Sequence, residues 1–159
     1  MDRSGKINRL RREAQRPRLI VESPYAGDVE MNEAFAENVC RFAVKAGYNP
    51  YASHLLFTRF LDDEVAEERR AGIGCGFGWR EIADEVWYCT RPDEAFTPGM
   101  ELAPAYDDRH DVDLFTRELT FTQDGVLVAG WKGPLPEDVP EHLLGPDYTR
   151  RLRVAGQAR

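Results

Sequence analysis

Apolar residues in this chain occur both in short continuous runs and at helical spacing. Arg18–Glu22 (RLIVE) and Glu85–Thr90 (EVWYCT) are short, mostly apolar runs of the kind found in strands buried on both faces. Between them, the apolar positions of residues 28–45 follow the 3.6-residue period of a helix. Asp28 is a candidate N-cap for this helix, and Gly47 marks its end.

Weaker patterns complete the order of elements. Two further strands are predicted at Tyr48–Ser53 and Val112–Leu119, a loop at residues 54–62, and helical segments at residues 4–15, at residues 63–79 and near Gly99–Ala105. Pro104 is expected to shorten or kink the last of these. Alternating strands and helices with short connections predict an α/β fold, a Rossmann- or flavodoxin-like parallel sheet of about four or five strands flanked by helices.

The C-terminal part has a different character. Thr120–Trp131 places Asp-Gly between β-prone residues, which predicts a hairpin. Residues 133–147 contain four prolines and are expected to form an irregular extension, with the last residues loosely held. We therefore divide the chain into a basic arm (1–17), an α/β domain (18–118) and a C-terminal hairpin with a proline-rich extension (119–159).

Charge is unevenly distributed along the chain. The net charge is −7, but residues 1–18 carry seven Lys and Arg against two acidic residues, which leaves +5 there and −12 elsewhere. An acidic body repels phosphate backbones, so polymeric nucleic acid is not the expected partner, except through the basic arm. We expect a cytoplasmic protein without a membrane span or a secretory signal. The three cysteines, without a CxxC pair, do not form a zinc motif.

Parallel sheets bind ligands beyond the carboxyl ends of their strands, so the candidate chemistry is sought there. The first such end is the turn Ser23-Pro24-Tyr25-Ala26-Gly27, where backbone N–H groups and the Tyr25 hydroxyl are available to a ligand. Ser53 and His54 follow the second strand, where His54 could bond a ligand or act as a general acid.

Carboxylates follow at two further places. Asp63 belongs to an acidic run that precedes a helix, where one or two acids could face the cleft. Thr97-Pro98-Gly99-Met100-Glu101 opens a helix at the mouth of the sheet, which suits Glu101 as a nucleophile on a sugar carbon. By spacing alone, each of these features is also typical of ordinary turns, helix starts and surface residues.

Together and in this order, these segments resemble the nucleoside 2-deoxyribosyltransferase-like family, particularly its small, phage-type members. The resemblance covers about residues 18–118. Its segments are the Pro-Tyr turn at Ser23–Gly27, Asn32, Ser53–Leu56, Glu67-Glu68-Arg69 leading to Trp79, Ala83-Asp84 and Gly99-Met100 followed by Glu101.

The resemblance implies double displacement at an N-glycosidic bond, in a nucleoside or nucleotide. Glu101 would attack C1′, Tyr25 would orient Glu101, and the base would lie near Ser53 and His54. Asp93 or Glu94 would stand in for an acid of the loop before the nucleophile. No metal or organic cofactor is needed, and the family's habit implies a homo-oligomer.

Three functions remain open from the sequence. The first is an N-glycosidase or deoxyribosyltransferase, the second a pocket that binds and sequesters a nucleotide-like ligand without catalysis, and the third a structural or assembly module. The base, the sugar, the need for a 5′-phosphate and the oligomeric state are left undetermined by the residues.

Overall fold

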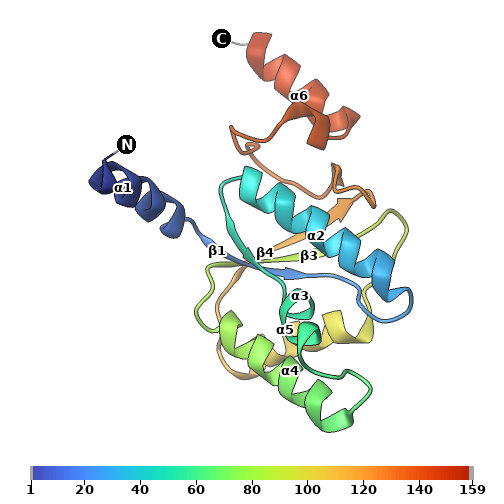
Figure 1. Ribbon diagram of the computed structural model, residues 1–159. Helices are drawn as coiled ribbons and strands as arrows, with labels where there is room; N and C mark the ends of the chain where they lie inside the picture. The colour runs from blue at the N-terminus through green and yellow to red at the C-terminus, as the bar shows by residue number, and fades with distance from the viewer. Residues whose placement is uncertain (1, 158–159) are drawn as a thin grey trace.

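The computed structural model describes residues 2–157 and shows a single mixed sheet between layers of helices (Figure 1). The strands are β1 Arg18–Glu22, β2 Asn49–Tyr51, β3 Glu85–Thr90, β4 Phe115–Phe121 and β5 Leu127–Ala129. The helices are α1 Arg3–Ala14, α2 Val29–Lys45, α3 Ser53–Leu56, α4 Ala66–Arg80, α5 Pro98–Arg109 and α6 Pro146–Gln157, with short 3₁₀ helices η1 Phe57–Arg59 and η2 Glu141–Leu143.

The sheet has the strand order β2-β1-β3-β4-β5. Strands β1 to β4 are parallel, and β5 pairs antiparallel with β4 as the second strand of a hairpin. The chain runs from β1 outward to β2 and then crosses to β3 on the other side of β1, which makes the β1/β3 boundary the switch point where such sheets bind ligands. The predicted fold class is confirmed.

Side-chain alternation along the strands divides the core between the two faces of the sheet. One face is covered by α2, with a core made of Leu19, Val21, Phe35, Val39, Phe42, Trp87, Cys89, Leu119 and Phe121 among others. The opposite face carries α4 and α5, over Ile20, Val86, Tyr88, Met100 and Ala103. Since Glu22 follows Ile20 by two residues, its side chain also lies on the α4/α5 face.

The C-terminal extension is part of the core. Trp131, Leu144 and Tyr148 are buried against the α2 face, and the Trp131 backbone N–H donates to the Tyr148 hydroxyl at 2.8 Å. The predicted boundary after residue 118 falls inside β4. Instead of an irregular end, the structure shows helix α6 at Pro146–Gln157, which Tyr148 anchors to the body while residues 150–156 are exposed.

Two local predictions are also corrected. The expected loop at residues 54–62 contains the end of α3 and all of η1. Helix α5 continues past Pro104 to Arg109, because tertiary bonds hold its second half: Asp107 pairs with Arg80, and the Tyr106 hydroxyl donates to Glu81 at 2.8 Å. Among residues 2–157, no helix combines the length and the apolar character needed to cross a bilayer.

Candidate functional site

A pocket of about 310 Å³ opens at the carboxyl edge of the sheet, on the α4/α5 face. This volume is at the lower end of the range of small-ligand sites. It brings together nine of the predicted site residues, from the turn after β1, from α3, from the loop before α4 and from the start of α5. They are Ser23, Tyr25, Ala26, Ser53, His54, Asp63, Thr97, Gly99 and Met100.

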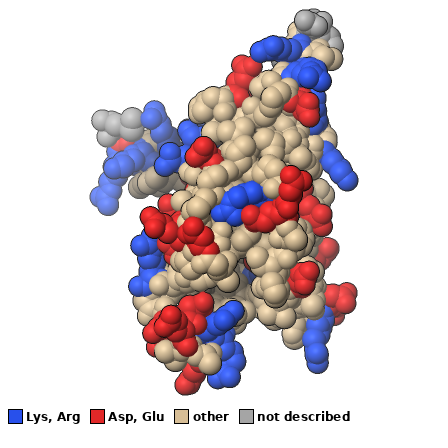
Figure 2. All heavy atoms as spheres, turned by 90° about the vertical axis from the view of Figure 1, so that its right-hand side faces the viewer, with Lys and Arg blue, Asp and Glu red and all other residues tan. Residues whose placement is uncertain are grey.

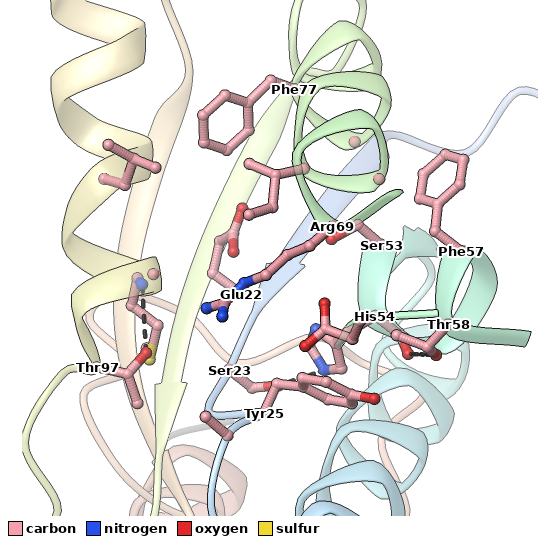
Figure 3. A pocket seen from close by; sticks show the side chains of 18 of the residues that line it. Glu22, Ser23, Tyr25, Ser53, His54, Phe57, Thr58, Arg69, Phe77 and Thr97 are labelled. Carbon is pink, nitrogen blue, oxygen red and sulfur yellow. Dashed lines mark hydrogen bonds between the residues drawn. The ribbon is translucent and has the colours of Figure 1, made fainter. Parts of the chain in front are cut away.

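The pocket has an apolar part and a polar part. Apolar side chains that line it include Ile20, Tyr51, Phe57, Ile73 and Phe77. The polar part is shown in Figure 3, where Ser23 and Tyr25 from the end of β1 lie beside His54, and Arg69 reaches from α4 across the pocket toward Glu22. Such a division suits a ligand with one flat apolar end and one hydrogen-bonding end.

Glu22 is the pocket carboxyl group with the most perturbed acidity. Its side chain is 16% exposed, and burial raises its pKa from 4.5 to about 7, against the opposing effect of Arg80. Arg80 Nη1 donates to Glu22 Oε1 at 2.7 Å. A carboxyl group with this pKa is divided between its protonated and ionised forms near neutral pH.

Arg80 connects Glu22 to α5 and β3. Its guanidinium is fully buried; it donates to Asp107 Oδ1 at 2.9 Å and Oδ2, and to the Tyr88 hydroxyl at 3.0 Å. One positive charge thus faces two carboxyl groups, Glu22 and Asp107. This imbalance favours a proton on one of them, in agreement with the raised pKa of Glu22.

His54 is a neutral hydrogen-bonding group in this site. Burial lowers its pKa from 6.5 to about 4, so it is uncharged at neutral pH and does not serve there as a general acid. Its Nε2 lies 3.1 Å from Ser23 Oγ, and its ring centroid lies 5.6 Å from that of Tyr25. The three side chains form one polar wall of the pocket.

A buried amide holds the turn that carries Tyr25. Asn32 Nδ2 donates to the carbonyl oxygens of Tyr25 at 3.0 Å and Ala26 at 3.1 Å, and its Oδ1 accepts from Arg91 at 2.8 Å. Asn32 therefore has a positioning role. In addition, the buried hydroxyl of Tyr51 has no hydrogen-bond partner among residues 2–157.

The structure does not place Glu101 in the pocket. Thr97 caps α5 by accepting from the Met100 N–H at 3.3 Å, and Met100 and Ala103 turn toward the core. At about 100° per residue, Glu101 then faces outward, and its side chain is exposed. The predicted meeting of Glu101 with Tyr25 across one sugar is therefore corrected.

Two other predicted residues also lie outside the pocket. Asp93 is exposed in the loop after β3 and has a left-handed φ of 61°. Gly27 lines the adjoining hollow, with a φ of 101°, and shapes the turn rather than the pocket wall.

Sequence reasoning missed Glu22, Arg69 and the aromatic lining. For Glu22 a signal was present, since it is a charged residue at the last position of an otherwise apolar strand, at the edge where ligands bind. For Arg69, Phe57 and Phe77 no comparable signal exists, because their direction depends on how α3, η1 and α4 pack together.

Gly76 determines how closely α4 approaches α3, and this gives a test of the packing. A Cβ at Gly76 would lie 2.8 Å from the Ser53 Cβ, whereas a Cβ at Gly74 would meet nothing within 4 Å. We expect Gly76→Ala to lower the free energy of unfolding by about 1–2 kcal/mol through overpacking. Gly74→Ala, the matched control, should raise it by about 0.5–1 kcal/mol through helix propensity. Urea denaturation measures both, and equal effects would contradict the close packing.

Within residues 2–157, no group of three or more His, Cys, Asp and Glu side chains is arranged to hold a metal ion. Fold and pocket together define a doubly wound α/β domain with a pocket at the switch point of its sheet. The chain belongs to the family described as a domain of unknown function, DUF7768, which matches residues 17–115. Comparisons with curated proteins and with solved structures give no match.

Proposed function

We propose that the protein binds a nucleoside or nucleotide in the pocket between α4 and α5. The observation that carries this proposal is the division of the pocket into an aromatic part and a polar wall. Tyr51, Phe57 and Phe77 offer apolar surface to a base, while Ser23, His54 and Tyr25 offer hydrogen bonds to a sugar. The resemblance noted in the sequence supports the choice of ligand, because four of its segments contribute to the pocket lining, through Ser23–Ala26, Ser53-His54, Glu68-Arg69 and Gly99-Met100.

Cleavage of the N-glycosidic bond is the activity that the acidity of Glu22 favours. A carboxyl group with a pKa of about 7 is suited to protonate a leaving base at neutral pH. In this reaction the C1′–N bond breaks, the base nitrogen takes the Glu22 proton, and water adds its hydroxyl to C1′ and returns a proton to Glu22. The carboxylates of Asp63 and Glu68 line the same pocket and favour the positive charge that develops on the sugar.

A panel of ribonucleosides, deoxyribonucleosides and their monophosphates tests both the proposed binding and the proposed cleavage. Calorimetry measures binding, and chromatography measures the release of free base. We expect Glu22→Gln to keep ligand binding and to lower base release by about 10²–10⁴-fold. Glu101→Gln makes the same chemical change outside the pocket and should alter neither quantity by more than about twofold.

The outcomes separate the three functions. Binding without base release by the wild-type protein would identify a sequestering pocket, and this second candidate is favoured by the position of Glu101 outside the site. Base release abolished by Glu101→Gln and kept by Glu22→Gln would contradict the role given to Glu22. Absence of binding across the panel would refute the ligand class and leave an assembly role.

A further inference from the structure

Helix α1 extends away from the body of the protein (Figure 1). Every residue of α1 is exposed, and Ile7 and Leu10 are 55% and 60% exposed. A helix of 12 residues is marginal in water unless tertiary contacts cover its apolar stripe. The stripe of Ile7, Leu10 and Ala14, at helical spacing, therefore requires a surface to pack on.

The chain's own body does not provide this surface. The link between α1 and β1 is residues 15–17, which span only about 10 Å when extended. That link is held in place, since Arg16 Nη1 donates to the Val44 carbonyl at 3.0 Å and the Pro17 carbonyl accepts from Asn49 N–H at 2.9 Å. Another molecule has to cover α1.

The charge of α1 specifies the chemistry of that surface. Five of its residues are basic, namely Arg3, Lys6, Arg9, Arg11 and Arg12, against the single acid Glu13. Figure 2 shows basic side chains gathered on the projecting N-terminal helix, while acidic side chains are spread over the body. The complementary surface is acidic at its rim and apolar at its floor.

This chain carries such a surface at the opposite end of β1. The acidic hollow, as we name it, is lined by Asp62, Asp63 and Glu64 together with Val29 and Leu61. Phe60 and Val65, which adjoin Leu61 and Glu64 in the sequence, are 63% and 45% exposed. Arg69 is the single basic residue among its lining.

We propose that α1 of one copy of this chain docks in the acidic hollow of a second copy. In this contact, basic side chains of α1 meet acidic side chains of the hollow. The contact also covers the apolar stripe of α1, together with the exposed Phe60 and Val65. The hollow and the pocket share six lining residues, so the partner's helix lies beside the pocket mouth; they are Tyr25, Ala26, Thr58, Leu61, Asp63 and Arg69. Assembly and ligand entry then occur at one edge of the sheet.

Sedimentation velocity of the full chain over a range of protein concentrations tests this. We expect the wild-type protein to self-associate and the dissociation constant to rise with salt, because opposite charges meet in the contact. Ile7→Asp with Leu10→Asp should raise the dissociation constant at least about tenfold. The thermal melting of each variant, at a concentration where it is monomeric, checks that the body still folds.

Charge variants provide the matched control and the decisive cross-test. Arg9→Glu should weaken association, whereas Arg41→Glu, an equal change on the exposed face of α2, should not. A variant with Asp62→Lys and Glu64→Lys should fail to self-associate but bind the variant with Arg9→Glu and Arg12→Glu. A wild-type protein that stays monomeric, association unaffected by Ile7→Asp with Leu10→Asp, or no pairing of the two charge-reversed variants would overturn the proposal.

Discussion

Replacing Arg80 with methionine is expected to lower the free energy of unfolding by about 3–5 kcal/mol. The guanidinium is fully buried and pairs with Glu22 and Asp107, so its removal leaves two carboxyl groups in a poorly solvated place without a countercharge. Methionine retains most of the volume, which isolates the loss of charge and hydrogen bonds from the loss of packing. Equilibrium denaturation at pH 7 measures the change.

Two further variants make this result specific. Arg150 forms a surface pair with Asp147 at 3.9 Å, with both side chains largely exposed, and Arg150→Met should cost at most about 1 kcal/mol. Adding Glu22→Gln to Arg80→Met should recover part of the lost stability, because only Asp107 then lacks its partner. If Arg80→Met were as stable as the wild-type protein, the bonds of Arg80 to Glu22 and Asp107 would not stabilise the packing of α4 against β1 and α5.

The stability that Glu22 contributes is expected to decrease as pH rises from about 4.5 to 7. Its pKa is 4.5 in the unfolded chain and about 7 in the folded protein, so the folded state binds the proton more tightly. The contribution is complete below pH 4.5 and is lost as pH rises through 7. The difference in unfolding free energy between wild type and Glu22→Gln should therefore shift against the wild type by at most about 3 kcal/mol over this window.

The comparison with Glu22→Gln is needed because His54 acts in the opposite direction. Its pKa falls from 6.5 to about 4 on folding, so its contribution is complete above pH 6.5 and is lost as pH falls through 4. The two effects offset each other in the wild-type protein between pH 4.5 and 6.5. Denaturation curves at several pH values measure the difference; a value that stays constant from pH 4.5 to 7 would show that the pKa of Glu22 is the same in the folded and the unfolded protein.

The position of Glu22 changes the chemistry expected of this site. A nucleophilic Glu101 would require a covalent glycosyl intermediate, but that carboxylate faces solvent on the outer side of α5. Glu22 lines the pocket and titrates near neutral pH, which suits proton donation to a leaving base. We therefore propose direct hydrolysis with Glu22 as the acid, and the comparison of base release by Glu22→Gln and by Glu101→Gln distinguishes it from the two-step route through Glu101.

Much of the fold was predictable because its signals are local. The buried runs of β1 and β3, the period of α2 and its Asp28 cap are confirmed. The Asp124-Gly125 turn of the β4–β5 hairpin was also predictable, since glycine adopts the left-handed φ of 83° found there. Helix α6 and the second half of α5 were not predictable from local signals, because Tyr148, Asp107 and Tyr106 stabilise them through contacts distant in sequence.

The sequence by itself determined an α/β sheet and the edge of that sheet at which the pocket lies. The period of the apolar residues and the order of strands and helices along the chain are enough for this, because both can be identified from short segments of the sequence. Only the tertiary structure decided which side chains face the pocket. A rotation of one residue on a helix separates Met100 in the core from Glu101 in solvent. Similarly, the acidity of Glu22 depends on burial and on Arg80, 58 residues away in the chain. The direction of a side chain and its removal from water both depend on how the helices and strands pack together. A local sequence pattern does not specify this packing.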